Sequence, residues 1–397
     1  NMKNLPKRAK SENSTKGGPN KVILIFAILM SIFGLIMIFD ASVYQANHGF
    51  NDQFHFLKLQ AIWLVASAII GTIIYLIDYR KLAKLSLPAL IVVIGLLLAV
   101  LIFGDDVNGS KRWFSLGPIP VQPAEFLKPV IILYLASWLA KQPSGSGKFE
   151  WSKLKHIFKT DFAKKLLTFA IIIGFVLGLV ILEPDLGTTM IIGLTSLAIF
   201  FISGTDTLHQ LGTIALTGVF GLLAVFAGVL ESYRFKRITT FLSLIFTGEV
   251  AEPRKEGYQM QQILIGIGSG GLFGVGFGQS RQRYGYLVEN TAFTDSIFAI
   301  ILEELGLVGG FVILLSWILF LWTGLKIALK APDRLGMLLA SGITIWLVLQ
   351  AFLNMAANVG LMPLTGIPLP FLTYGGSNTL VTVIGIAFLL NVSKYRK

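Results

Sequence analysis

The chain has 397 residues, of which 54% are hydrophobic and 14% are charged, and its formal net charge is +12. A soluble domain carries roughly a quarter charged residues, so this composition excludes an ordinary soluble protein and predicts one that spans a membrane several times. Cysteine is absent, which excludes disulfides, thiolate metal sites and cysteine nucleophiles. In a membrane protein the positive charge indicates cytoplasmic loops near anionic lipids rather than binding of nucleic acid.

The first part of the chain, residues 1–20, is polar and basic, and we expect a disordered cytoplasmic tail there. Ten apolar stretches follow that are long enough to cross a bilayer, which takes about 20 helical residues. We predict helices near residues 21–40, 57–78, 85–103, 123–141, 164–183, 186–203, 207–230, 295–322, 335–357 and 375–393. The sequence therefore predicts an all-α polytopic integral membrane protein.

Lysine and arginine set the expected orientation. They gather in the N-terminal tail, at the C-terminus and in the connections after the second, fourth and eighth helices. With ten passes, all of these segments lie on one side, which the positive-inside rule makes cytoplasmic. Both termini are then expected inside, and the long connection over residues 231–294, between the seventh and eighth helices, is expected outside.

The first external segment of interest is residues 105–129, where turn-forming Gly and Pro alternate with charges. Lys111 and Arg112 place two cations on the outer face. Glu125 and Lys128 lie three residues apart on the following helix, close enough to pair. Two alternatives remain open: the pair only neutralises two buried charges, or Lys128 faces an anionic ligand while Glu125 holds it in place.

The second segment, residues 183–189, reads EPDLGTT and predicts a tight external turn. Asp185 is suited to cap the helix that follows, because its carboxylate can accept from the first free backbone N–H groups. A role for Asp185 in lining a cavity remains the alternative.

The third segment, residues 231–294, has two parts. Arg234 and Arg237 followed by apolar residues predict a short helix lying in the membrane surface. Residues 257–280 are rich in glycine, which predicts a re-entrant segment packed closely on neighbouring helices. The glycines also fit GxGxxG, but no strand precedes them and no βαβ unit is present, so a dinucleotide site is rejected.

Asp295 stands where the chain enters the eighth helix, directly after this long loop. An aspartate at a helix start is an ordinary N-cap, whereas an ionisable residue at a membrane threshold is also a functional candidate by default. We expect the external cations to converge around it; they are Lys111, Arg112, Lys128, Arg281 and Arg283.

Glu303 and Glu304 lie further along, in the apolar interior of the eighth helix. At 3.6 residues per turn they sit about 80° and about 180° around the helix from Asp295, so they are not expected to face one cavity together. We therefore expect this pair to have an architectural role.

A single carboxylate beside several cations at the outer surface suits transfer from a lipid pyrophosphate. The departing pyrophosphate needs fixed positive charge, and the attacking hydroxyl needs one general base. Inverting glycosyl transfer from a lipid-pyrophosphate donor has these requirements. No metal site or cofactor is predicted because no ligand cluster is visible, although Mg²⁺ or Mn²⁺ could screen the pyrophosphate. Alone, the residues indicate a membrane protein with an outward polar cavity for an anionic lipid.

Five motifs resemble, in content and in order, the signatures of the SEDS proteins (shape, elongation, division and sporulation). They are NGSKRWFSLGPIPVQPAEFLKP (108–129), EPDLGTT (183–189), GYQMQQILIGIGSGGLFGVGFGQS (257–280), TDSIFAIILEELG (294–306) and PLTGIPLPFLTYGGS (363–377). The resemblance implies that residues 21–397 form one SEDS-type transmembrane domain. VNGSKRWFSLG is closer to the division members of the family than to the elongation members.

The resemblance also implies an activity and a setting. The protein would be a peptidoglycan glycosyltransferase that polymerises lipid II at the outer face of the bacterial cytoplasmic membrane and releases undecaprenyl pyrophosphate. It would work at the division septum with a class B penicillin-binding protein and other divisome membrane proteins. A lipid II flippase and a non-catalytic scaffold for the penicillin-binding protein remain the alternative functions.

The resemblance also assigns roles to individual residues, according to their positions in the motifs. The resemblance implies that Asp295 is the general base. It also implies that Glu125 and Lys128 form the family's glutamate–lysine pair, and that Asp185 is the acid of its DLGT motif.

The chain departs from the family's pattern in three places. The family usually has Pro-Glu about four residues before the aspartate, whereas Val-Glu at residues 288–289 lies six before Asp295, an apparent two-residue insertion. Ala124 replaces the usual serine of QPSE, and Thr373 and Asn378 alter the usual SYGGSS. The insertion bears on how the loop approaches Asp295.

Overall fold

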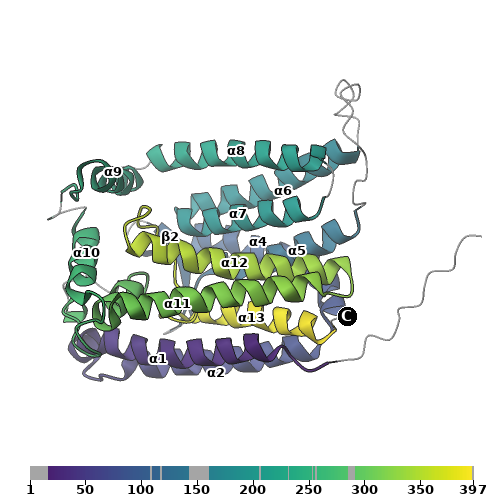
Figure 1. Ribbon diagram of the computed structural model, residues 1–397. Coiled ribbons are helices and arrows are strands. Elements are labelled where there is room, and N and C mark those ends of the chain that lie inside the picture. Colours follow the sequence, from purple (N-terminus) through teal and green to yellow (C-terminus); the bar gives the residue numbers. More distant parts are fainter. Residues whose placement is uncertain are drawn as a thin grey trace, which may run out of the picture.

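The computed structural model describes residues 17–107, 110–116, 119–142, 161–204, 207–230, 232–252, 254, 257–284 and 291–395. Most of the expected N-terminal tail and the Val-Glu pair at residues 288–289 lie outside these ranges. The long helices run side by side across the molecule (Figure 1). They are α1 (Lys21–Phe50), α2 (His55–Leu76), α4 (Ser86–Phe103), α5 (Pro123–Ala140), α6 (Asp161–Leu182), α7 (Leu186–Ile202), α8 (Thr207–Leu230), α11 (Ile297–Leu329), α12 (Arg334–Asn358) and α13 (Gly376–Lys394).

Shorter elements connect these helices. They are α3 (Tyr79–Leu82), η1 (Ala83–Leu85), α9 (Ser232–Thr247), α10 (Tyr258–Gly270) and η3 (Gln282–Tyr284). The helix predicted at the start of the long loop is confirmed as α9, while its position in the membrane surface stays a prediction.

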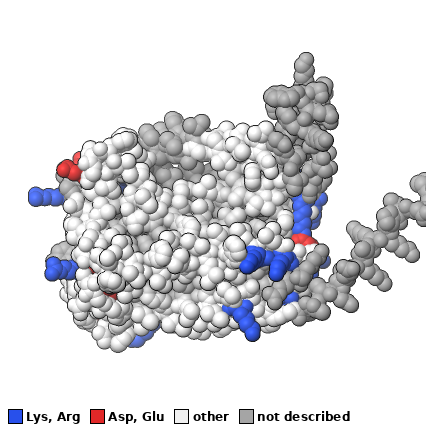
Figure 2. All heavy atoms as spheres, in the orientation of Figure 1, with Lys and Arg blue, Asp and Glu red and all other residues white. Residues whose placement is uncertain are grey.

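Length and hydropathy identify a multi-pass membrane protein. Among the described residues, eight helical stretches are long and apolar enough to cross a bilayer, and α7 is apolar but has only 17 residues. Charged side chains gather mainly at the two ends of the molecule, and its broad middle is uncharged on the face seen in Figure 2. An uncharged middle suits contact with lipid chains. The total of ten spans and the orientation of the termini stay predictions.

The bundle has a buried centre that differs from its rim. Between 72% and 78% of the spanning stretches of α5, α12 and α13 are buried, compared with 33% for α1 and 17% for α2. The rim helices present apolar side chains outward, as expected of helices that face lipid. Polar side chains within the span are costly in lipid, and the central helices are where they can find partners.

A small sheet stands at the end of α4, where the sequence predicted only turns. It is antiparallel, in the order β1 (Asp105–Val107), β2 (Ser110–Leu116) and β3 (Ile119–Val121). Trp113 pairs with Asp105 and Phe114 with Val121. The two-residue Asn-Gly at 108–109 is a common hairpin connection, and it is the signal that could have predicted these strands. The all-α prediction therefore holds for the helical bundle but not for this segment.

The glycine-rich segment fills a break in α11. Gly306 has φ 68° and ψ −170°, so the helix is interrupted there and its neighbouring backbone groups need other partners. Four backbone hydrogen bonds of 3.0–3.1 Å supply them: Leu307 N–H to Gly271 O, Val308 N–H to Leu272 O, Val275 N–H to Glu303 O and Gly276 N–H to Glu304 O. Close packing of this segment on a neighbouring helix is confirmed.

Candidate functional site

Asp295 lies in a turn at residues 292–296, and its side chain is half-buried. Helix α11 begins at Ile297 with Ser296 as its N-cap residue, so Asp295 stands one position before the cap. Its carboxylate accepts from the hydroxyl of Thr294 at 3.1 Å. The N-cap interpretation of Asp295 is therefore wrong, and the carboxylate is left available for other chemistry.

The backbone around Asp295 is held by elements distant in sequence. Its carbonyl accepts from Asn354 Nδ2 at 2.7 Å and from Asn358 Nδ2 at 2.9 Å. The carbonyl of Thr294 accepts from Thr373 Oγ1 at 3.0 Å, and that of Phe293 from the N–H of Tyr374 at 2.9 Å. Three consecutive carbonyls are thus occupied by α12 and by the loop before α13, which keeps this turn out of the helix.

Glu125 and Lys128 form a deeply buried ion pair on α5. Their charged atoms are 2.7 Å apart, and the two side chains are 4% and 1% exposed. Lys128 also donates to Gln350 Oε1 at 3.2 Å, and one oxygen of Glu125 has no hydrogen-bond partner. Pairing is confirmed. The alternative that Lys128 faces an anionic ligand stays a prediction.

A polar stripe on α12 connects this ion pair to the turn of Asp295. Gln350, Asn354 and Asn358 are spaced by four residues, so they lie on one face of the helix. Gln350 binds Lys128 at one end of the stripe, and the two asparagines bind Asp295 at the other. These residues were not predicted from the sequence. The available signal was three amides at helical spacing in an apolar span, since intramembrane polar residues mark functional sites.

Asp185 caps α7, as predicted. Its Oδ1 accepts from the N–H of Thr188 at 2.9 Å, and its Oδ2 accepts from the hydroxyl of Thr188 at 2.9 Å and from Gln122 Nε2 at 3.0 Å. The N–H of Gln122 donates to Ser377 Oγ at 3.2 Å. Asp185 is thereby joined to the start of α5 and of α13, although its oxygens are occupied by protein groups.

Lys111 and Arg112 of β2 are bound to backbone carbonyls at helix ends. Lys111 Nζ donates to Ile102 O of α4 at 3.2 Å. Arg112 Nε donates to Glu183 O at 2.6 Å, and its Nη2 donates to Pro184 O at 2.5 Å. The carbonyls at the C-terminus of a helix are unpaired and carry partial negative charge, so they attract cations.

Glu183 was not predicted as a site residue, yet it is fully buried and neither of its carboxyl oxygens has a hydrogen-bond partner. Burial, with a smaller contribution from Asp185, raises the pKa of Glu183 to about 8, against the opposing effect of Arg112. The raised pKa favours the neutral, protonated form of this side chain near neutral pH.

The predicted convergence of cations on Asp295 is not seen. Within the ranges that the structure describes, no ion pair joins a cation to its carboxylate. Arg283 instead pairs with Asp40 of α1 and also donates to Gly278 O, while the side chain of Arg281 is exposed. Helix-end carbonyls and buried carboxylates lie closer to these cations and hold them.

Glu303 and Glu304 both face the glycine-rich segment. Glu303 accepts from the hydroxyl of Ser280 and, at 3.0 Å, from the N–H of Arg281. Glu304 accepts from the N–H of Ser280 at 3.1 Å. Both carboxylates reach the same serine because they are long side chains on adjacent residues, and the prediction that they do not face one cavity together stays a prediction. Their contacts brace this segment, which is the architectural role that the sequence predicted.

Comparison with known proteins now identifies the family. Residues 20–397 match the FtsW/RodA/SpoVE cell cycle protein family. The chain belongs to this family. It is 36% identical to the stage V sporulation protein E of Bacillus subtilis, over 96% of this chain and 99% of that protein. It is 38% identical to a probable peptidoglycan glycosyltransferase FtsW of Legionella pneumophila, over 93% of this chain and 88% of that protein.

Solved structures agree with this FtsW/RodA-type fold. A chain from a peptidoglycan synthase complex that coordinates polymerization and crosslinking superimposes with a TM-score of 0.72 at 25% identity, covering 94% of this chain and 97% of that chain. The rod shape determining protein RodA of Thermus thermophilus superimposes with a TM-score of 0.65 at 24% identity, covering 95% of this chain and 97% of that chain. The second similarity supports the fold alone.

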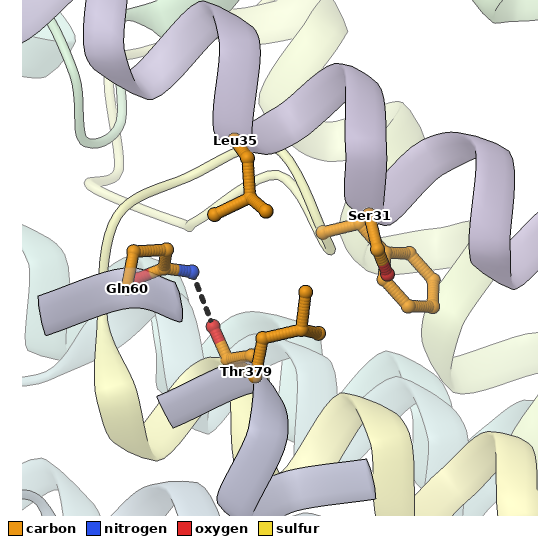
Figure 3. A pocket seen from close by; sticks show the side chains of 6 residues that line it. Ser31, Leu35, Gln60 and Thr379 are labelled. Carbon is orange, nitrogen blue, oxygen red and sulfur yellow. Dashed lines mark hydrogen bonds between the residues drawn. The ribbon is translucent and has the colours of Figure 1, made fainter. Parts of the chain in front are cut away.

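A small pocket lies between α1, α2 and the start of α13 (Figure 3). It is lined by Ser31, Leu35, Gln60, Leu64, Phe371 and Thr379. Gln60 Nε2 donates to Thr379 Oγ1 at 2.7 Å, and Gln60 Oε1 accepts from the N–H of Gly375 at 3.2 Å. Gly375 adjoins Tyr374, which binds the turn of Asp295, so α2 supports the site indirectly. Among the described residues, no group of three or more His, Asp or Glu side chains is arranged to hold a metal ion.

Proposed function

We propose that this member of the FtsW/RodA/SpoVE family is a peptidoglycan glycosyltransferase that polymerises lipid II at the outer face of the bacterial cytoplasmic membrane, at the division septum. Relatives at 33–38% identity, over 93–95% of this chain, are named probable peptidoglycan glycosyltransferases. The catalytic role is supported by the geometry of Asp295. Its backbone carbonyl is held by two asparagines, while its carboxylate does not cap α11.

The reaction is a single displacement. The carboxylate of Asp295 accepts the proton of the 4-hydroxyl of one disaccharide as that oxygen attacks the anomeric carbon of a second lipid II. The bond between that carbon and the pyrophosphate oxygen breaks, and undecaprenyl pyrophosphate departs with the electron pair. Configuration at the anomeric carbon inverts. A firmly held base matters because small misplacements of catalytic groups are costly in rate.

Positive charge is needed where the pyrophosphate develops negative charge. Of the five proposed cations, Lys111 and Arg281 have exposed side chains, but Lys111, like Arg112, Lys128 and Arg283, already donates to a protein group. We assign Arg281 the first contact with the pyrophosphate. Lys128 and its partner Glu125 then act from within the bundle, and Asp185 shapes the start of α7. A divalent cation such as Mg²⁺ remains a candidate for screening the pyrophosphate.

The partner we propose is a class B penicillin-binding protein, which would crosslink the new strand within the divisome. This follows from the likeness to a chain of a peptidoglycan synthase complex.

The test compares the wild type with Asp295→Asn, both bound to this partner in detergent and supplied with labelled lipid II. We expect the wild type to lengthen glycan strands and Asp295→Asn to bind the partner and melt normally without lengthening them. Asp52→Asn is the matched control, because Asp52 is an aspartate on the same predicted side that pairs with Lys58 in an exposed ion pair. Lengthening by Asp295→Asn at the wild-type rate would remove the base role. Movement of labelled lipid II from one leaflet of a proteoliposome membrane to the other, without lengthening, would support the flippase instead.

A further inference from the structure

Two asparagines of α12 donate to one carbonyl, that of Asp295, at 2.7 Å from Asn354 and 2.9 Å from Asn358. Both side chains are buried, at 2% and 1% exposed. A carbonyl oxygen has two lone pairs, so these two amides occupy it fully. We propose that Asn354 and Asn358 form an amide clamp: they are positioning residues that keep Asp295 out of α11 so that its carboxylate remains available as the base. This inference rests on the function proposed above.

The need for a clamp follows from how helices begin. The N-cap residue uses its carbonyl to accept the first intrahelical hydrogen bond, while its side chain accepts from the backbone N–H two or three residues on. Aspartate is among the residues most favoured at that position. If α11 grew by one residue at its start, Asp295 would become the cap. Its carboxylate would then accept backbone N–H groups, which stabilise the charged form and make it a weaker base.

The clamp blocks this extension by occupying the carbonyl that the cap would need. An N-cap at Asp295 would receive the N–H of Ala299, but that N–H donates to Ser296 O at 3.0 Å. The N-cap therefore falls one residue later, at Ser296, whose own side chain makes no capping hydrogen bond. Asp295, although favoured as a capping residue, does not cap the helix because its carbonyl is bound by two side chains of α12.

The two amides are themselves held in place. Asn354 Nδ2 also donates to Ile367 O at 2.7 Å, and Asn358 Nδ2 also donates to Asn354 O at 3.0 Å. One turn earlier, Gln350 joins the same stripe to Lys128. Donors fixed in this way can define the position of the turn, rather than follow it.

Asn391 of α13 supplies a matched structural control. It is fully buried, it donates to Ile74 O at 2.7 Å and to Ile77 O, and it accepts from the N–H of Tyr79. Like the clamp residues, it binds backbone carbonyls of another segment. Asn391 belongs to the last turn of α13, and the C-terminal end of α13 lies at the opposite end of the bundle from the start of α11 (Figure 1). Its loss should therefore affect stability without moving the base.

The experiment replaces each asparagine by leucine, which has a similar shape but no donor, in the full chain bound to its penicillin-binding partner. Lengthening of lipid II yields kcat and KM, and melting in detergent yields stability. We expect kcat to fall roughly threefold in Asn354→Leu and in Asn358→Leu, as for the loss of one hydrogen bond. The double variant should lose on the order of 100-fold, as expected for a misplaced catalytic group, with KM little changed. This exceeds the product of the single effects because the carbonyl has then lost both donors.

Further variants separate positioning from folding. Asn354→Gln and Asn358→Gln keep a donor, and each should retain more of kcat than the leucine variant at the same position. Asn391→Leu should lower the melting temperature and leave kcat unchanged. The clamp is overturned if the double leucine variant keeps the wild-type kcat while Asp295→Asn is inactive, or if Asn391→Leu lowers kcat as much as the double variant. An active Asp295→Asn would overturn the proposed function itself, and the clamp with it.

Discussion

Gly306→Ala tests whether the break in α11 is a required part of the fold. A Cβ at Gly306 would lie 2.4 Å from Gly274 N and 2.4 Å from Leu272 O, and both are backbone atoms that cannot rotate away. The residue also has φ 68° with ψ −170°, a combination that side chains other than glycine rarely adopt and that costs about 1–3 kcal/mol. Separating the two segments would also weaken their bridging hydrogen bonds, each worth about 1 kcal/mol or more. We expect a loss of roughly 3–6 kcal/mol in the free energy of unfolding.

The assay is thermal unfolding in detergent, where a loss of this size corresponds to a fall in Tm of roughly 4–7 °C for a chain of this length. Gly268→Ala is the matched control: it lies on α10, it has no positive φ, and no atom lies within 4 Å of its added Cβ. This control should melt at or slightly above the wild-type temperature, because alanine favours helix over glycine. A wild-type Tm for Gly306→Ala would refute the reasoning, since it would mean that the glycine-rich segment does not pack into the break.

Three further outcomes follow from the buried charges. Arg283→Met should lower stability by about 3–5 kcal/mol in detergent melts, because it leaves the carboxylate of Asp40 buried without its cation; an unchanged Tm would contradict the pairing. Lys128→Met should cost a similar amount, and adding Glu125→Gln should recover much of it by removing the orphaned charge, so a double variant less stable than the single would exclude a simple ion pair. The pKa of Glu183 is raised from its ordinary value of 4.5 to about 8, so the stabilisation from its neutral form is complete below about pH 4.5 and is lost as the pH rises through 8. Glu183→Gln should reduce this loss of stability with rising pH, and above pH 8 the variant should be more stable than the wild type by at most about 5 kcal/mol. Parallel curves of Tm against pH for the two proteins would show that Glu183 is not buried as a neutral acid.

The contacts also show how the glycine-rich segment is held at its end of the bundle. Arg283 links the glycine-rich segment to α1 through Asp40, while Glu303 and Glu304 bind the same segment from α11. Arg283 and Asp40 neutralise each other, whereas Glu303 and Glu304 accept hydrogen bonds from Ser280 and from the N–H of Arg281. The segment that leads toward Asp295 is therefore anchored to two helices.

The sequence by itself determined where the long apolar helices lie and which family the chain belongs to. The helix predicted over residues 123–141 is observed as Pro123–Ala140, because the need for about 20 apolar residues is a local property and proline favours the first turn. The order of the five motifs likewise predicted the family, and Asp185 followed local capping rules. Each of these features depends on residues close together in the chain.

Tertiary structure decided what the charged residues do. Whether Asp295 caps α11 depends on Asn354 and Asn358, about 60 residues away, because they compete with the helix for its carbonyl. The partners of Arg112 and Arg283 were likewise unpredictable, since helix-end carbonyls and buried carboxylates attract a cation as strongly as a substrate does. A charge binds the partner that the fold brings nearest, and only the packing of α1, α11 and α12 determines which one that is.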